Sequence, residues 1–221
     1  MKLLALETAN EQCSVSLIDE NQVLFYQLDD RAKAQTQSIL PMIEAAFQQA
    51  EVHVSDLDAI AFSRGPGSFS GVRINAAVTQ ALAWSHDVPV IPVSSLQALA
   101  QAAYRMYQLT EVTAVLDARM SEVYIASFQL NAQGLMQLVD EEQLLNYENA
   151  AAYQKFQMIG SGTKCIHPEL NDYSNVQATA EDIATIAREH ALEEHWLSAD
   201  LALPVYLRDN AWKKIPEQGK A

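Results

Sequence analysis

The segment KLLALETANEQCSVSLIDENQVLFYQL, which runs from Lys2 to Leu28, decides the fold. It contains an apolar run at Lys2–Leu6, an alternating run at Cys13–Ile18 and a third run at Val23–Leu28. In the middle run, apolar residues alternate with serines, which is the period of a β-strand with two different faces. The residues between the runs favour tight turns. We therefore predict a three-stranded antiparallel meander.

After this segment the apolar period lengthens from two to nearly four residues, which predicts helices alternating with buried strands. The expected helices are Thr36–Ala50, Val72–Ser85 and one capped by Ser94, and the expected strands are Asp58–Ser63 and Val88–Val93. Thr36 or Ser38 is expected to cap the first of these helices. A meander followed by strand–helix crossovers predicts a mixed sheet with helices on both faces.

The same order of elements then restarts in a shorter form. It comprises strands at Glu111–Leu116, Glu122–Gln129, Met136–Val139 and Gln157–Ile159, a helix at Glu148–Phe156, and a helix that Thr179 and Asp182 begin as a capping box. We therefore predict a duplicated α/β fold with mixed sheets, divided into residues 1–108 and 109–221, with a cleft between the halves. The tail Leu201–Trp212 is expected to be extended and to pack back on the first half.

Composition limits the classes of partner. The chain has 221 residues, 49% of them hydrophobic, and a formal net charge of −14. Such an acidic surface repels phosphate backbones, so it favours a basic protein partner or simple solubility over direct binding of RNA or DNA. Two cysteines, Cys13 and Cys165, cannot form a disulfide framework. The N-terminal apolar run is too short for a signal peptide or a membrane span, so we expect a cytoplasmic protein.

The densest local signal is RGPGSFSGVR (Arg64–Arg73), which holds three of the seven glycines between an expected strand and an expected helix. This position suits an anion. However, the segment lacks the Gly-Lys-Ser/Thr ending of a Walker loop, and it has no serine midway between its glycines as a nucleophile elbow requires. It matches a dinucleotide loop only weakly. The alternative is that the glycines allow a tight turn and close helix packing.

Two acidic residues end expected central strands, Glu7 in the first half and Asp117 in the second. Facing each other across a cleft, they would form a pair suited to a metal-bound phosphate. The alternative is that Asp117 caps its turn and pairs with Arg119. No His-x-x-x-His spacing occurs, so we predict no metal site and no catalytic residue.

Four stretches together resemble the bacterial TsaB (YeaZ) family. They are Leu4–Ser16 (LALETANEQCSVS), Thr36–Ile43 (TQSILPMI), Arg64–Ile74 (RGPGSFSGVRI) with Asp117–Tyr124 (DARMSEVY), and Pro204–Lys214 (PVYLRDNAWKK). The resemblance implies an actin-like or sugar-kinase-like ATPase fold, of ribonuclease-H-like type. It also implies a non-catalytic subunit that works with TsaD and TsaE to place a threonylcarbamoyl group on adenosine 37 of tRNAs reading codons that start with adenine.

The resemblance further implies a homodimer when the chain is alone, contact with tRNA only through the complex, and no cofactor other than ATP or ADP at the partner interface. It places a vestigial nucleotide cleft at Glu7, Thr8, Gly65, Gly67, Ser68, Asp117 and Arg119. The chain departs from the family pattern where Glu7 replaces aspartate, Ser70 replaces threonine and Asn75 replaces glycine. These changes favour a scaffold. The alternative is a free-standing ATPase or small-molecule phosphotransferase of the same fold.

The helices expected at Thr36–Ala50 and Val72–Ser85 flank the glycine loop and are rich in small and apolar residues. A helix that is apolar on several faces is either buried or part of an interface. We therefore expect these two helices to dock onto TsaD or a second copy. The expected contact residues are Ile39, Ile43, Phe69, Arg73, Ala77, Val78 and Ala81, with Phe69 and Arg73 as anchors.

Overall fold

The computed structural model describes residues 1–20, 22–170, 172–193 and 195–208. Its first sheet has the order β3 (Val23–Asp29), β2 (Cys13–Ile18), β1 (Leu3–Glu7), β4 (Ala59–Gly65) and β5 (Val90–Ser94). The first three strands are antiparallel, as predicted, and β4 and β5 run parallel to β1. The expected mixed sheet is therefore confirmed.

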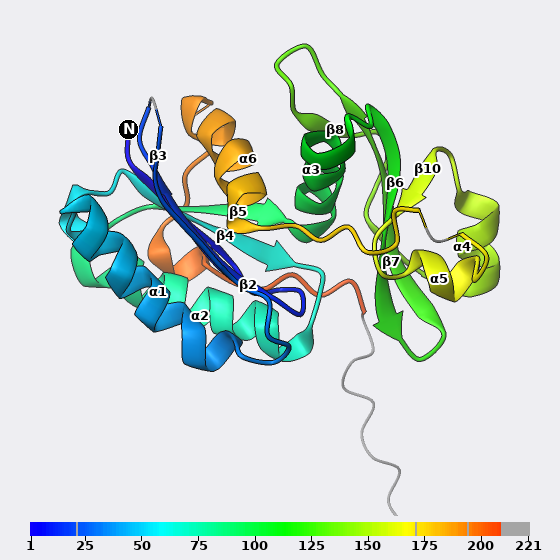
Figure 1. Cartoon of the computed structure of the whole chain (residues 1–221), viewed down its shortest axis with the longest axis horizontal. Coiled ribbons are helices and arrows are strands. Elements are labelled where there is room, and N and C mark those ends of the chain that lie inside the picture. The colour runs from blue at the N-terminus through cyan, green and yellow to red at the C-terminus, as the bar shows by residue number, and fades with distance from the viewer. Residues whose placement is uncertain (21, 171, 194, 209–221) are drawn as a thin grey trace, which may run out of the picture.

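The second sheet repeats this arrangement with fewer residues. It comprises β10 (Gln157–Ile159), β6 (Glu111–Arg119), β7 (Glu122–Leu130) and β8 (Met136–Leu138), with β9 (Gln143–Asn146) also paired to β7. In each sheet a central strand, β1 or β6, has an antiparallel neighbour on one side and a parallel neighbour on the other. The chain thus has a duplicated ribonuclease-H-like fold of the actin-like ATPase type. Figure 1 shows the two sheets with the helices that pack on them.

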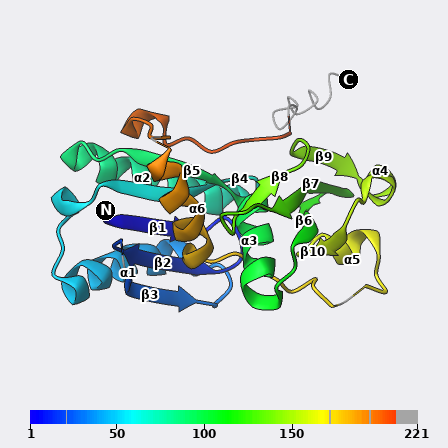
Figure 2. The same ribbon diagram turned by 90° about the horizontal axis from the view of Figure 1, so that it is seen from above.

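Helices α1 (Gln35–Ala50) and α2 (Phe69–His86) cover one face of the first sheet, and α6 (Ala180–Leu192) covers the other (Figures 1 and 2). Alternate residues of β1 explain this, because Leu4 and Leu6 belong to the core under α1 and α2, whereas Leu3 and Ala5 belong to the core under α6. The remaining helices are α3 (Ser95–Tyr107), α4 (Tyr147–Tyr153) and α5 (Thr163–Ile166), with 3-10 turns at Val54–Asp56 and Ala199–Leu201.

Two helices pack across the division predicted near residue 109. Most apolar residues of α3 join the core of the second sheet, and α6, from the far end of the chain, joins the core of the first. The division into residues 1–108 and 109–221 stays a prediction, but the two halves exchange helices around it. This exchange also explains why the serine face of β2 is buried, since the Ala180 amide at the start of α6 donates a hydrogen bond of 2.8 Å to Ser14 Oγ.

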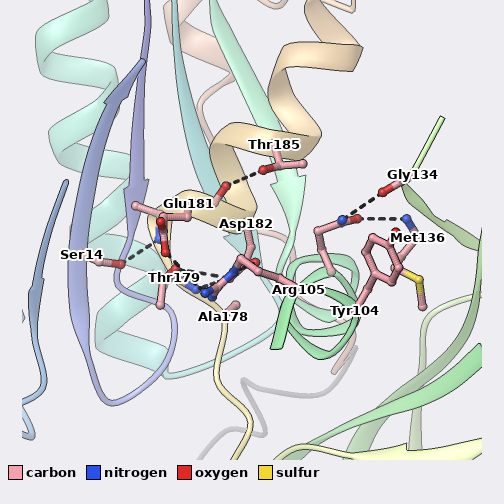
Figure 3. A network of polar contacts seen from close by, with 12 residues as sticks. Ser14, Tyr104, Arg105, Gly134, Met136, Ala178, Thr179, Glu181, Asp182 and Thr185 are labelled. Carbon is pink, nitrogen blue, oxygen red and sulfur yellow. Dashed lines mark hydrogen bonds and ion pairs between the residues drawn. The ribbon is translucent and has the colours of Figure 1, made fainter. Parts of the chain in front are cut away.

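A polar network fixes α6 against α3 (Figure 3). The predicted capping box is confirmed, because Asp182 accepts from the Thr179 amide at 2.9 Å. The same fully buried carboxylate receives two bonds from Arg105 on α3, Nε to Oδ1 at 2.9 Å and Nη2 to Oδ2 at 3.0 Å. A two-pronged arginine contact of this kind fixes orientation as well as charge.

The other expected cap at Ser94 is confirmed, because its hydroxyl accepts from the amides of Leu96 and Gln97. The expectation for α1 is wrong, since this helix begins after Ala34 with no side-chain cap. Ser38 instead lies within the helix and donates to Asp29 at the end of β3. Its hydroxyl ties the helix to the sheet. Ser38 therefore makes a tertiary contact in place of the helix cap that its residue type favours.

After the second 3-10 turn the chain runs back along α2 toward the second sheet (Figure 2). We call Leu203–Arg208 the strap. The Val205 amide donates to the Arg64 carbonyl at 2.8 Å, next to the glycine loop. Arg208 then reaches the hairpin of the second sheet, where its Nη2 lies 2.6 Å from Glu122 Oε2 and 3.1 Å from the Ala118 carbonyl oxygen. Of the expected extended tail, Asp209–Trp212 lies outside the described residues, as do Lys213 and Lys214 of the quoted motif.

Candidate functional site: a closed glycine loop and an exposed helix face

The glycine loop packs directly on the end of β1. The Ser68 amide donates to the Ala9 carbonyl at 2.7 Å, and Thr8 Oγ1 donates to the Gly71 carbonyl at 2.7 Å. A Cβ on Gly67 would lie 2.5 Å from the Ala9 carbonyl oxygen, and one on Gly71 would clash harder with the Thr8 carbonyl oxygen. Gly67 and Gly71 are therefore required by a close approach of two backbones. Residues 8 and 9 therefore pack against the side of the loop on which Gly67 and Gly71 lack a side chain.

The end of the loop is held by α2 rather than opened toward a ligand. Ser68 caps α2 by accepting from the Gly71 amide. Further along the helix, the Asn75 amide nitrogen donates to Ser63 Oγ at 2.7 Å and to the Leu6 carbonyl at 3.1 Å. Asn75 is fully buried. This residue, which departs from the family pattern, thus ties the helix to both β1 and β4.

Glu7 ends β1 beneath this loop and is almost completely buried, with a relative exposure of 1%. Its Oε1 accepts a hydrogen bond from the Ala9 amide. Burial raises the pKa of Glu7 to about 7, although the Ala9 amide, Ser63 and the Asn10 amide oppose this effect by hydrogen bonding. Among the described residues, no positively charged group influences this carboxyl, and the nearby Asp182 raises its pKa further. Burial under the loop therefore keeps this carboxyl protonated to a higher pH than an exposed glutamate.

Asp117, the equivalent strand-end acid of the second half, has a different surrounding. Its Oδ1 accepts from the Arg119 amide at 2.8 Å, and its Oδ2 lies 3.0 Å from Arg119 Nη1. The turn cap and the local pairing of the alternative are thus present, and the shared site with Glu7 stays a prediction. The structure thus brings Glu7, Thr8, Gly67 and Ser68 together and leaves Asp117 and Arg119 on a separate hairpin.

Gly65, the remaining residue of the expected nucleotide cleft, packs against the strap. It adopts a φ of +99°, and a Cβ on it would lie 3.1 Å from the Val205 carbonyl oxygen of the strap. Its role is therefore to let the strap pass closely over the end of β4. Two surface pockets lie elsewhere, one between β3 and α1 and one beside Asp87 and Trp196, and neither is lined by a residue of the expected nucleotide cleft.

Comparison with known proteins identifies the family. A family model described as "TsaD: tRNA N6-adenosine threonylcarbamoyltransferase" matches residues 29–214. The chain is 36% identical to the tRNA threonylcarbamoyladenosine biosynthesis protein TsaB of Escherichia coli strain K12, covering 98% of this chain and 99% of that protein. The chain belongs to the TsaB family. The protein of the same name from Haemophilus influenzae is 35% identical, with 98% of each chain covered.

The fold of the TsaB family is also found in a solved structure. YeaZ from Pseudomonas aeruginosa superposes with a TM-score of 0.85 at 37% identity, covering 93% of this chain and 99% of that one. The likeness therefore extends over both sheets, including the short second half.

In this TsaB family member, α2 presents a continuous stripe to the outside. Phe69, Ala77, Ala81 and Trp84 are exposed, and Arg73 is half-buried between them. They recur at intervals of three or four residues, which places them on one side of the helix. We call this stripe the α2 face. It carries four of the expected contact residues on one surface, and the sequence pattern missed Trp84, whose exposure is 68%.

The other expected contact residues are not on that surface. Ile39 and Ile43 have exposures of 1% and 3% and belong to the core between α1 and the sheet, so the expectation that they meet a partner is wrong. Val78 is partly buried against the same core. The apolar stripe of α1 that the sequence showed is the one that packs inward, and its exposed side presents Leu40 and Pro41 instead.

Three further findings describe the chain's general chemistry. No helix within the described ranges is long and apolar enough to cross a membrane. Among the residues that the structure describes, no three His, Cys, Asp or Glu side chains are grouped to hold a metal ion. Cys13 and Cys165 are free thiols, the first of them buried.

Proposed function

We propose that this protein is an accessory, non-catalytic subunit in the biosynthesis of threonylcarbamoyladenosine on tRNA. In this role it binds a TsaD protein and, with TsaE, supports transfer of the threonylcarbamoyl group to adenosine 37 of tRNAs that read codons starting with adenine. The chain itself contacts tRNA only through the complex. The support comes from two relatives that are named for this pathway. Each aligns with the chain over at least 98% of its own length.

The observation that carries the non-catalytic role is the closed glycine loop. In phosphate-binding loops of this kind, free backbone amides at the helix start face the anion. Here the Ser68 amide is bonded to Ala9, the Gly71 amide is bonded to Ser68, and the backbone of Thr8 and Ala9 packs against Gly67 and Gly71. The strand-end acid beneath them, Glu7, is buried and forms no ion pair with a lysine or arginine of the described residues. These features leave the loop as a packing device.

The α2 face supports the partner-binding role. Exposed aromatic side chains beside an arginine and small residues are the composition of protein–protein contacts. Ala77 and Ala81 allow another helix to approach closely between the larger Phe69 and Trp84. We propose that this face binds TsaD in the complex and a second copy of the chain when TsaD is absent.

Reconstitution tests the proposal directly. TsaD and TsaE are incubated with tRNA, threonine, bicarbonate and ATP, together with the enzyme that makes the threonylcarbamoyl adenylate, with and without this chain. The modified nucleoside is measured by mass spectrometry after digestion. We expect modification to depend on the chain and to fall strongly for Ala77→Arg, which places a long cation in the centre of the α2 face. Arg188→Ala on α6 serves as the matched control and should support full modification. Equal modification without the chain would refute the proposal.

The alternative function, a free-standing ATPase or phosphotransferase, makes a different prediction. The purified chain would then hydrolyse ATP in the presence of Mg²⁺, or bind it tightly, without any partner. We propose that it does neither, and that any ATP or ADP associated with the protein lies at the interface with its partner. Measuring ATP turnover and nucleotide binding for the chain alone, and then for its mixture with TsaD, separates the two functions.

A further inference from the structure

Arg73 on α2 is clamped by two aromatic rings. Its guanidinium carbon lies 3.4 Å from the centre of the Phe69 ring and 4.9 Å from the centre of the Tyr206 ring, and its Nη1 donates to the Phe69 carbonyl at 2.9 Å. Phe69 precedes it by one helical turn, whereas Tyr206 comes from the strap. A planar guanidinium between rings is oriented at little entropic cost when it meets another group.

This arginine is unusual in an acidic chain. Six arginines, Arg31, Arg64, Arg105, Arg119, Arg188 and Arg208, have a carboxylate within ion-pair distance, whereas Arg73 has none among the described residues. The single hydrogen bond to Phe69 uses one of its five donors. The remaining donors meet no carboxylate in the part of the chain that the structure describes.

The strap that supplies Tyr206 is fastened at both ends of this region. Upstream, Gln80 on α2 donates to the Asp200 carbonyl, and the Val205 amide is bonded to Arg64. Downstream, Arg208 is paired with Glu122 and its Nη1 lies 3.0 Å from Met120 Sδ at the hairpin tip. Tyr206 is thus held beside α2 by contacts on either side of it.

Large apolar side chains are also exposed on the strap and on the hairpin that it contacts. Leu203 of the strap is 56% exposed, and Met120, which Arg208 contacts, is 81% exposed. Phe69 and Trp84 on α2 and Tyr206 of the strap are exposed as well. An interface through this region would bury such side chains.

We propose that the strap is part of the docking surface, and that Tyr206 holds Arg73 ready to receive a carboxylate from the partner protein. The inference rests on the proposed function, because it names the chemistry by which the α2 face recognises its partner. Arg73 is the charged anchor, Tyr206 is its positioning residue, and Leu203 and Met120 widen the apolar contact. The partner presents an acidic side chain opposite Arg73 within an apolar surface.

A different protein fits this surface better than a second copy does. Helix α2 contains no Asp or Glu over its 18 residues, so α2 of a second copy, packed against α2, would supply no carboxylate for Arg73. A charged group left without a partner at the centre of an interface reduces affinity. Self-association through the same face is therefore weaker than binding to a partner that supplies the acid.

The test measures the dissociation constant for purified TsaD by isothermal titration, and self-association by sedimentation, for four variants. Tyr206→Ala and Arg73→Lys each weaken TsaD binding by about tenfold, since one removes the clamp and the other removes the planar fork. Tyr206→Phe keeps the ring and leaves binding unchanged. Arg188→Ala, on the exposed side of α6, is the control for loss of an arginine elsewhere. Thermal unfolding of each variant checks that the fold is kept.

The outcomes separate this inference from the proposed function. If wild-type chain does not bind TsaD at all, the proposed function fails. If wild-type chain binds but Tyr206→Ala and Arg73→Lys bind equally well, the function stands and the clamp is overturned. If these variants lose self-association and keep TsaD binding, the occupant is a second copy and the inference is again overturned. TsaD binding that is reduced in Tyr206→Ala but unchanged in Tyr206→Phe supports it, and raising the salt concentration should then weaken the binding of wild-type chain to TsaD.

Discussion

The two halves of the molecule place a carboxylate at the same point of the same topology and treat it in opposite ways. Glu7 ends central strand β1, and Asp117 lies near the end of central strand β6. Glu7 is buried under the glycine loop without a cationic partner, whereas Asp117 is paired with Arg119 on a hairpin. The position of a carboxylate in the fold therefore does not determine its environment. The segment that packs over the carboxylate determines it.

The loops that follow the parallel neighbours β4 and β10 show what the halves share. In the first half, Gly67 and Gly71 allow close packing on residues 8 and 9. In the second, the Gly162 amide donates to the Val115 carbonyl at 3.1 Å, and a Cβ on Gly160 would lie 2.6 Å from the same oxygen. Both loops thus approach the backbone of a central strand too closely for a side chain. In both halves the loop after the parallel neighbour of the central strand is a packing position.

Substituting the loop glycines is the severest way to break this arrangement. Gly71→Ala sets a methyl group against the Thr8 carbonyl, a backbone atom that cannot move aside. We expect a loss of at least about 3 kcal/mol in the free energy of unfolding, measured by urea denaturation. Gly134→Ala is the matched comparison: its φ is +82° but nothing lies within 4 Å of the new Cβ, so the loss should be about 1 kcal/mol. Equal losses at the two sites would show that the close approach at Gly71 is unimportant.

The contrast between the two carboxylates predicts a pH dependence for Glu7. Its pKa is raised from 4.5 to about 7 by burial, so the unfolded chain releases this proton at lower pH than the folded one. Its contribution to stability is therefore full below pH 4.5 and falls as the pH rises to about 7, by up to about 3 kcal/mol. Glu7→Gln removes that loss and should be more stable than wild type at pH 8 but not at pH 4.5.

Asp117→Asn provides the other side of this comparison. It loses an ion pair in which the Arg119 side chain is 79% exposed, which is worth less than about 1 kcal/mol. Denaturant midpoints of wild type, Glu7→Gln and Asp117→Asn across this pH range measure the difference. A flat profile for wild type, or a Glu7→Gln variant no more stable than wild type at pH 8, would mean that Glu7 is solvated rather than buried.

Much of the fold could be predicted from local sequence. The alternation in Cys13–Ile18 and the Ser94 and Thr179 caps act within a few residues, and their element bounds or caps agree with the structure. The close packing of the glycine loop was one of two open alternatives, because glycine permits both an anion cradle and a backbone contact. Only the neighbouring Thr8 and Ala9 decide between them.

The predictions that were wrong share one cause. The sequence period shows which residues lie on one face of an element, but it does not show whether that face meets the core or the solvent. Ile39 and Ile43 mark the apolar side of α1, and that side meets the sheet. The serine side of β2 would face water in an isolated sheet, yet α6 arrives from residues 180–192 to cover it. Tyr206 beside Arg73 joins positions more than a hundred residues apart, and no local pattern indicates such a contact.

The last comparison concerns the strap that joins the halves, and it contrasts an arginine that bridges two segments with one that pairs locally. Arg208 pairs with Glu122 at 2.6 Å and donates to the Ala118 carbonyl, with only 20% of its side chain exposed. Arg208→Ala should cost about 1–2 kcal/mol in the free energy of unfolding, because a partly buried ion pair and a hydrogen bond are lost together. Arg119→Ala removes a pair from the same hairpin, but a mostly exposed one, and should cost less than about 0.5 kcal/mol. Both arginines contact the hairpin between β6 and β7. Equal losses of stability in thermal and urea unfolding would show that the strap does not stabilise this hairpin. A larger loss for Arg208→Ala would show that the strap links the two sheets.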